Sequence, residues 1–185
     1  MNKVPQASRL PDSTEIKLLA MDCDGVLTDG GLFYFDNGMQ ARRFSVRDGA
    51  WLRIWHRQGF QSAIITGKES DAVEVRARDL EVNYLYQRAH YKGPVFQQLL
   101  ADSGIPAENI AYVGDDVIDL PIFQMAGLSI AVADAAPEVL ETADYVTKAK
   151  GGHGAVREVI CYLLKQMNLY DEAVKRYLCP EKEHR

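Results

Sequence analysis

The stretch Ala20-Met21-Asp22-Cys23-Asp24-Gly25-Val26-Leu27-Thr28-Asp29 places three aspartates directly after an apolar run. Neighbouring carboxylates repel one another, so a cluster of this kind indicates a bound cation. The short apolar run before it, rich in Ile, Leu and Ala, is typical of a buried strand. We therefore expect a strand that ends in an acidic, cation-binding turn.

Similar apolar runs recur along the chain and alternate with segments of helical period, which predicts a parallel sheet covered by helices. The expected strands are 16–22, 61–66, 84–86, 109–114, 128–133 and 144–146. The expected helices run from an N-cap at Asp48 to just before Gly59, over 69–80, from Pro94 to Gly104, from Asp116 or Asp119 over a short stretch, and over 154–166. The predicted fold class is α/β, with a doubly wound, mostly parallel sheet.

One segment interrupts this alternation. Strand-like residues 32–36 and 39–46 flank Asn37-Gly38, the strongest short signal for a β-hairpin. We predict a projecting hairpin over 31–46 that follows the first strand directly.

The bulk properties limit the classes of function. A length of 185 residues predicts a single domain over 1–185, with a core of about 16–167 and loose ends at 1–14 and 179–185. The formal net charge of -5 argues against nucleic acid as a partner. No apolar run is long enough for a bilayer span, and the three cysteines lack zinc or disulfide spacing. We expect a cytoplasmic protein without a membrane partner.

Polar residues follow several of the predicted strands, and the carboxyl ends of parallel strands meet at one edge of a sheet. These residues are Asp22 and Asp24 after the first strand, Thr66-Gly67 after the second, Lys92 after the third, and Gly114-Asp115-Asp116 after the fourth. The combination suits phosphoryl transfer, in which a carboxylate attacks phosphorus and forms an aspartyl-phosphate.

Each of these groups has an expected role in that chemistry. Asp22 is the expected nucleophile, and Asp24 is placed to protonate the leaving alkoxide and later to activate water. Asp22 and Asp115 could hold Mg²⁺, which prefers oxygen ligands. Thr66 with neighbouring amide groups, and Lys92, could hold the phosphate oxygens.

The same residues resemble the four motifs of the haloacid dehalogenase superfamily of phosphohydrolases. The matching positions are Asp22-Cys23-Asp24-Gly25-Val26, Thr66, Lys92, and Gly114-Asp115-Asp116 with Asp119. The resemblance implies a Rossmann-like fold with Asp116 and Asp119 as supporting residues. The short intervals between the motifs leave no room for a cap domain.

A closer resemblance, over about 16–173, is to the 3-deoxy-D-manno-octulosonate 8-phosphate phosphatases. It is carried by Asp24–Gly30, Phe44–Gly49, Ile65–Gly67, Ala111–Asp116, Ala131–Ala135, Ala143–Thr147 and Gly151–Glu158. That family implies a magnesium-dependent homotetramer in which hairpins assemble centrally and a neighbouring subunit helps to cover the active site.

Carried over by position, the resemblance implies further site residues. The metal ligands would be Asp22, Asp115 and the backbone carbonyl of Asp24. The substrate contacts would be Ser45, Val46, Arg47, Asp48, Gly49, Arg53, Lys68, Arg76, Lys92 and His153. The family usually has Arg where this chain has Lys68 and His153, and neither residue reproduces the planar fork of Arg. A nine-carbon sialic-type acid 9-phosphate is therefore the alternative substrate.

Other readings of these residues remain open. A phosphorylatable receiver domain also joins acids, Thr and Lys at one sheet edge, but it is a switch and not a turnover enzyme. A scaffold that has lost turnover is a third possibility. Singly, Asp24, Asp115 and Asp116 could cap turns or helices, and Arg53 and Arg76 could be solvated.

Overall fold

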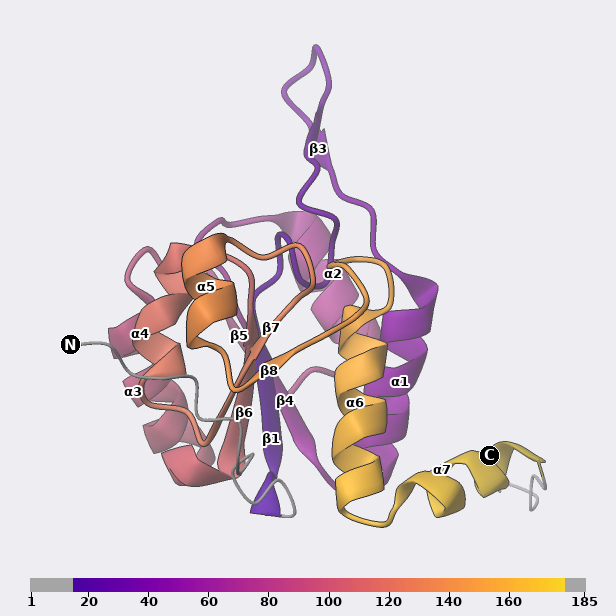
Figure 1. Cartoon of the computed structure of the whole chain (residues 1–185). Helices are drawn as coiled ribbons and strands as arrows, with labels where there is room; N and C mark the ends of the chain where they lie inside the picture. The colour runs from indigo at the N-terminus through magenta and orange to yellow at the C-terminus, as the bar shows by residue number, and fades with distance from the viewer. Residues whose placement is uncertain (1–14, 179–185) are drawn as a thin grey trace.

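The computed structural model describes residues 15–178, and its strands form one six-stranded parallel sheet in the order β5-β4-β1-β6-β7-β8 (Figure 1). The strands are β1 Leu18–Met21, β4 Gln61–Ile65, β5 Tyr84–Tyr86, β6 Ile110–Gly114, β7 Leu128–Ala131 and β8 Tyr145–Val146. From β1 the chain moves outward through β4 to β5 and then returns to β6 on the other side of β1. The order of the strands therefore reverses between β1 and β6, where doubly wound sheets bind their ligands.

Helices cover both faces of the sheet. They are α1 Val46–Arg57, α2 Asp71–Asp79, α3 Lys92–Ser103, α4 Leu120–Phe123, α5 Pro137–Thr142, α6 Ala155–Gln166 and α7 Tyr170–Leu178. Figure 1 shows α1 and α6 side by side on one face and α3, α4 and α5 on the other. Short 3-10 turns lie at Ala107–Asn109 and Val117–Asp119. The predicted doubly wound parallel fold is confirmed.

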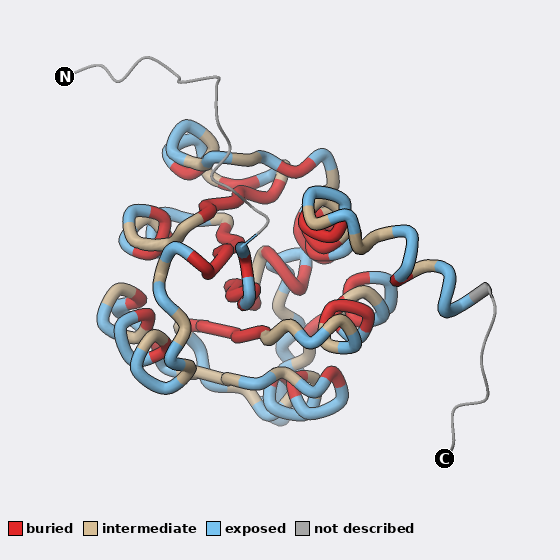
Figure 2. Tube along the Cα trace, turned by 90° about the horizontal axis from the view of Figure 1, so that it is seen from below, coloured by how far each residue is buried: buried red, intermediate tan, exposed pale blue. Residues whose placement is uncertain are grey.

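The centre of the sheet is buried from solvent, and Figure 2 shows the buried segments gathered between the exposed outer faces of the helices. All residues of β1 and β6 are buried. A strand covered on both faces has a continuous apolar sequence instead of an alternating one, which explains the LLAM run of β1. The polar residues that follow such a strand are held rigidly at its tip.

A β-hairpin projects from the carboxyl edge of the sheet (Figure 1). Its antiparallel strands, β2 Phe33–Tyr34 and β3 Gln40–Ala41, are shorter than the sequence pattern predicts. Within the described residues, the rest of the chain between Asp22 and Lys92 forms only α1, β4, α2 and β5. No cap domain is inserted there.

The first helix begins earlier than predicted, and Asp48 is not its N-cap. Ser45, with an extended backbone, caps α1, and its Oγ accepts a hydrogen bond from the Asp48 amide. The Asp48 carboxylate turns to another helix, where it accepts hydrogen bonds from the amides of Gly154 (3.1 Å) and Arg157 (2.8 Å). Asp48 therefore caps the start of α6 from a distant part of the chain.

Other differences lie at element ends. The third helix begins at Lys92, so that Pro94 falls inside its first turn. The helices α5 and α7 were not predicted. The predicted loose ends at 1–14 and 179–185 lie outside the described residues. No helix within 15–178 is long and apolar enough to cross a bilayer.

Candidate active site

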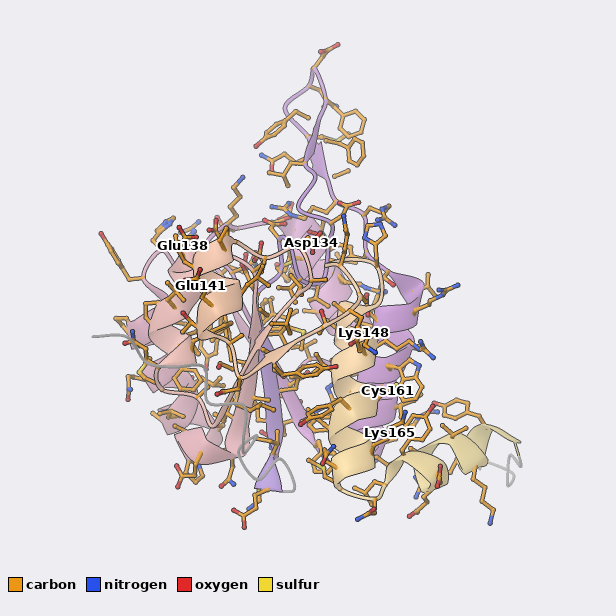
Figure 3. All side chains as sticks on the ribbon, viewed as in Figure 1. Asp134, Glu138, Glu141, Lys148, Cys161 and Lys165 are labelled. Atoms are coloured by element: carbon orange, nitrogen blue, oxygen red, sulfur yellow. The ribbon has the colours of Figure 1, made fainter. Side chains whose placement is uncertain are left out.

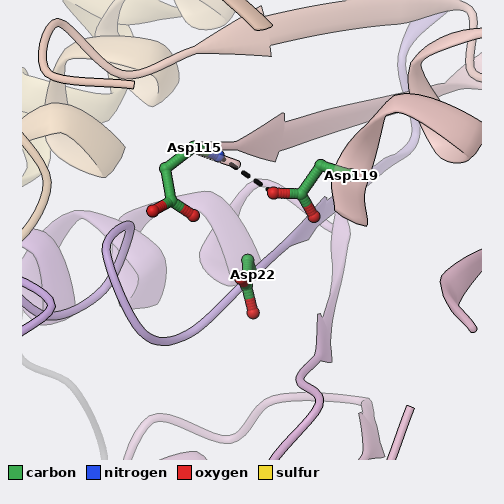
Figure 4. A group of neighbouring side chains, drawn as sticks. All are labelled: Asp22, Asp115 and Asp119. Carbon is green, nitrogen blue, oxygen red and sulfur yellow. Dashed lines mark hydrogen bonds between the residues drawn. The ribbon is translucent and has the colours of Figure 1, made fainter. Parts of the chain in front are cut away.

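Three aspartates meet at the tips of two adjacent strands. Met21 of β1 pairs with Val113 of β6, so Asp22 and the loop after Gly114 lie side by side. Asp22, Asp115 and Asp119 each offer a carboxylate oxygen, and these oxygens lie within 4.8 Å of one another (Figure 4). Asp22 and Asp119 are buried and Asp115 is half-buried. The acids of the first and fourth predicted strands therefore share one small volume.

Glycine is required beside this group. Gly25 has φ +94°, and a Cβ there would lie 2.0 Å from Oδ2 of Asp115. A Cβ on Gly114 would lie 2.6 Å from the side chain of Asp119. The two glycines thus let the side chains of Asp115 and Asp119 approach the backbone at the carboxyl ends of β1 and β6.

Lys92 enters the same group from the first turn of α3. Its side chain is fully buried, and Nζ lies 2.8 Å from Oδ2 of Asp22 and 2.5 Å from Oδ1 of Asp119. The ammonium also donates to the hydroxyl of Tyr112 (3.3 Å), which in turn donates to Oδ1 of Asp119 (2.6 Å). The sequence analysis missed Tyr112, although a tyrosine inside a buried strand needs a partner for its hydroxyl.

Asp119 also fixes the loop that carries Asp115. Its Oδ2 accepts hydrogen bonds from the amides of Asp115 (3.0 Å) and Asp116 (3.2 Å). The exposed Asp116 caps the following turn, because its Oδ1 accepts from the Val117 amide (2.7 Å). Asp116 therefore shapes the loop, while Asp119 both shapes it and lies against Asp22.

The charges in this group do not balance. Burial raises the pKa of Asp22 to about 6, although Lys92 acts in the opposite direction. Burial, followed by the charges of Asp22 and Asp119, raises the pKa of Asp115 to about 8. Burial alone would lower the pKa of Lys92, but the two nearby carboxylates raise it. One ammonium thus faces three carboxylates, and the surplus negative charge favours a proton or a cation.

The Asp24 carboxylate lies outside this group and is held by an arginine that the sequence analysis did not single out. Arg42 Nε donates to Asp24 Oδ1 at 2.6 Å, and its Nη2 donates to Oδ2 at 3.2 Å. The third nitrogen of Arg42, Nη1, donates to Ser70 Oγ (2.8 Å). Between the two catalytic candidates, Cys23 is buried, as expected for a packing thiol, and burial raises its pKa.

Thr66 and Gly67 follow β4, the other neighbour of β1. The Thr66 amide donates to Tyr86 O (2.9 Å) and its carbonyl accepts from the Ala89 amide (3.0 Å), so the backbone here is fixed. Thr66 is buried and Gly67 half-buried. Lys68 is exposed and makes no hydrogen bond or ion pair within residues 15–178.

A second group of predicted contacts lies between α1 and α2. Arg76 Nη2 donates to Ser45 O (3.1 Å), and a Cβ on Gly49 would lie 2.4 Å from the same nitrogen. Arg53 Nη2 donates to Asp79 O (2.6 Å). Arg76 is half-buried, whereas Arg53 is exposed. Ser45, Gly49 and Arg76 are therefore neighbours, and Arg53 contacts the C-terminal end of α2. No hydrogen bond within 15–178 joins these four residues to Asp22 or Lys92.

A third group lies along α6. Arg47 and His153 line a groove of ≈ 290 Å³ together with Arg157, Cys161 and Lys165. Figure 3 shows Cys161 and Lys165 on α6, which forms a wall of this groove. Val46, at the start of α1, is 82% exposed. The predicted substrate contacts are thus spread over several places in a single chain: Lys92 beside Asp22, the group between α1 and α2, and the groove along α6.

The structure accommodates the unusual His153. Its Nδ1 lies 2.8 Å from Gly151 O, a geometry that requires the proton on Nδ1, and leaves Nε2 to accept from Arg43 Nη2 (2.9 Å). Arg43 is also paired with Asp29 (2.8 Å). An arginine in place of His153 would bring a second guanidinium against Arg43.

Comparison with known proteins identifies the family. Residues 51–160 match the model of the haloacid dehalogenase-like hydrolases. The chain belongs to this family. It is 44% identical over 90% of its length, and 89% of the relative, to the 3-deoxy-D-manno-octulosonate 8-phosphate phosphatase KdsC of Escherichia coli K12. It is 46% identical to KdsC of Salmonella typhi, over 85% of this chain and 84% of that one.

Solved structures of haloacid dehalogenase-like hydrolases are also similar. The 3-deoxy-D-manno-octulosonate 8-phosphate phosphatase of Moraxella catarrhalis, in complex with magnesium, phosphate and KDO, superposes with a TM-score of 0.87 at 36% identity, over 90% of this chain and 95% of that one. The corresponding phosphatase of Yersinia pestis superposes with a TM-score of 0.85 at 41% identity, over 86% of each chain.

The haloacid dehalogenase-like hydrolase described here has a donor set that fits Mg²⁺. The side-chain donors of the acidic group are all carboxylate oxygens, and no sulfur or imidazole lies among them. Hard divalent cations bind such oxygens, and magnesium typically takes one or two carboxylates from the protein. Burial first, and then the charges of neighbouring aspartates, raise the pKa values of Asp22 and Asp115, and a bound divalent cation would favour the charged form of both carboxylates.

Proposed function

We propose that this chain is a magnesium-dependent phosphatase that hydrolyses 3-deoxy-D-manno-octulosonate 8-phosphate to the free sugar acid and phosphate. The main observation behind this proposal is the buried Asp22 carboxylate, which lies against Lys92. One carboxylate oxygen from each of Asp22, Asp115 and Asp119 lies within 4.8 Å of the other two. The named activity of relatives that match along about nine-tenths of their length supports this assignment.

Asp22 is the nucleophile in this proposal. Its Oδ1 accepts from the Cys23 amide (2.6 Å) and its Oδ2 faces Lys92, so the carboxylate has a fixed direction. One of its oxygens bonds to phosphorus while the bond from phosphorus to the sugar oxygen breaks, which gives an aspartyl-phosphate. Asp24 protonates the departing alkoxide and then takes a proton from the water that hydrolyses the aspartyl-phosphate.

The charge that develops on the phosphoryl group is met by fixed groups. The Lys92 ammonium is buried, and the hydroxyl of Thr66 and the amide of Gly67 come from a backbone already held by β5 and its loop. Preorganised donors of this kind need no reorganisation during the reaction. Bound Mg²⁺, with Asp22, Asp115 and the Asp24 carbonyl as ligands, supplies positive charge that offsets the repulsion between carboxylate and phosphate.

Recognition of the sugar acid is assigned to the remaining residues. These are Ser45, Val46, Arg47, Asp48, Gly49, Arg53, Lys68, Arg76 and His153. The Asp48 carboxylate is already occupied by two amides of α6, so its contribution comes through its backbone and through the placement of that helix. The alternative substrate, a nine-carbon sialic-type acid 9-phosphate, is kept because of Lys68 and His153.

The test is a comparison of kcat/KM for the two sugar-acid phosphates and for 4-nitrophenyl phosphate, with magnesium and with EDTA. We expect the eight-carbon acid to exceed the nine-carbon acid by about tenfold or more, as one well-placed contact can provide. We expect EDTA to stop turnover of all three. The reverse order would identify the alternative substrate, and a single phosphorylation without steady release of phosphate would identify a receiver-type switch.

We further propose that the chain assembles as a cytoplasmic homotetramer through its hairpins. Phe33, Tyr34, Phe35 and Met39 project from the body with exposed fractions of 59%, 65%, 51% and 59%. Apolar side chains gathered on one projecting element mark an interaction site. The two described cysteines, Cys23 and Cys161, are free, which agrees with a reducing compartment.

Replacing Phe33 by glutamate is expected to lower the molecular mass of the assembly, because an unpaired charge would enter a desolvated contact. Light scattering after size-exclusion chromatography measures this mass. Tyr91→Glu is the control, since Tyr91 is 83% exposed but lies on the body at the start of α3. A Phe33→Glu protein with the mass of the wild type would contradict hairpin assembly.

A further inference from the structure

Arg42 is an arginine with a buried side chain. It follows β3 at the base of the hairpin, and its side chain has an exposed fraction of 0%. Both oxygens of Asp24 and the hydroxyl of Ser70 accept hydrogen bonds from its nitrogens, at 2.6, 3.2 and 2.8 Å. The contact between Arg42 and Asp24 is therefore a bidentate guanidinium–carboxylate pair, which fixes the direction of the carboxylate as well as its distance.

Such burial is costly for stability alone. Removing a guanidinium from water costs several kcal/mol, and the attraction within a buried pair offsets this only when the geometry is good. The next residue, Arg43, attaches the same segment of chain through exposed contacts with Asp29 and His153. Anchoring the hairpin therefore does not require a buried arginine on Asp24.

The other partner of Arg42 is also held in place. Ser70 is the N-cap residue of α2, and its amide donates to Gln87 Oε1 (2.6 Å). Arg42 thus joins the base of the hairpin, the turn after β1 and the start of α2. The Asp24 side chain is 24% exposed, so part of it stays accessible while the fork holds it.

We propose that Arg42 is a positioning residue that holds the Asp24 carboxylate in the direction needed for proton transfer, and that the base of the hairpin thereby sets the geometry of the catalytic acid. The inference rests on the proposed function, in which Asp24 moves the proton. Each Asp24 oxygen accepts one hydrogen bond from the guanidinium of Arg42. Each oxygen keeps a second lone pair, which is left for the substrate oxygen or for water.

The decisive experiment is a double-mutant cycle on kcat/KM, which reports the steps up to formation of the aspartyl-phosphate. We expect Arg42→Gln to lower kcat/KM for the sugar-acid phosphate by about tenfold to a hundredfold. The loss for 4-nitrophenyl phosphate should be only a few-fold, because a nitrophenolate leaves without a proton. In the Asp24→Asn background, Arg42→Gln should have almost no further effect.

Two variants control for folding. Arg42→Lys keeps the charge but not the fork, and it should recover only part of the activity. Arg78→Gln removes an arginine from an exposed pair with Glu74 on α2 and should leave both substrates unaffected. Where Arg42→Gln does not fold, the cycle is run with Arg42→Lys.

The outcomes separate the two proposals. If Arg42→Gln lowered kcat/KM equally for both substrates, or by the same factor in the Asp24→Asn background, the proposed role of Arg42 would be overturned. The phosphatase assignment would stand in either case. A wild-type protein that releases no phosphate from either substrate would overturn the proposed function, and this inference with it.

Discussion

Replacing Asp22 by asparagine is expected to lower kcat by about four orders of magnitude or more, as loss of a covalent nucleophile does in other hydrolases. Asparagine has the same shape, and its amide oxygen can still accept from the Cys23 amide, which donates to Asp22 at 2.6 Å. It has no carboxylate to bond to phosphorus. Single-turnover measurements with rapid quenching should show no phosphorylated protein in the Asp22→Asn variant.

The fold should survive this change. The raised pKa of Asp22 shows that burial opposes its charge, so a neutral side chain of equal size is tolerated, and Lys92 keeps Asp119 as a partner. Thermal unfolding and circular dichroism measure this. Asp171→Asn, at an exposed position of α7, is the matched control and should keep full activity. A freshly purified Asp22→Asn protein with a near wild-type rate would show that another group attacks phosphorus.

The prediction about the acids depended on topology and not on side-chain detail. Asp22 and Asp115 follow apolar runs that were predicted as strands of one parallel sheet, and the carboxyl ends of such strands share an edge. Their meeting was therefore predictable from the sequence. The role of Asp119 was harder to predict, because an aspartate there could hold a metal, pair with Lys92 or cap a loop. In the structure Asp119 pairs with Lys92 and accepts a hydrogen bond from the loop amide of Asp115.

What the sequence could not provide were contacts between distant segments. Arg42 meets Asp24 only because the hairpin returns to the tip of β1, and Asp48 meets α6 only because α1 and α6 pack together. A surface helix cap and a buried tertiary cap have the same local pattern, so the sequence favoured the nearer one. The helix α5 spans only Pro137–Thr142, which is too short for its period to be distinguished from a loop.

Replacing Lys92 by methionine is expected to have the largest effect on stability. Methionine preserves the volume but leaves the buried carboxylates of Asp22 and Asp119 without the ammonium that lies 2.8 and 2.5 Å from them. Removing one partner of a buried ion pair costs about 3 to 5 kcal/mol, because the remaining charge is uncompensated. Lys17→Met, at an exposed position beside β1, is the control and should change the free energy of unfolding little.

The decrease in the free energy of unfolding caused by Lys92→Met should depend on pH in a defined direction. In the wild type the pKa of Asp22 is about 6, raised by burial and held down by Lys92, so removing Lys92 raises it further. A group whose pKa is higher in the folded state than in the unfolded state stabilises at low pH, and this stability is lost as the pH rises through the folded value. The deficit of the variant should therefore be larger at pH 8 than at pH 5. Urea unfolding measures the free energy of unfolding of both proteins, and EDTA excludes a metal that could replace the ammonium. An equal difference between the wild type and the variant at both pH values would mean that Asp22 is not charged beside Lys92.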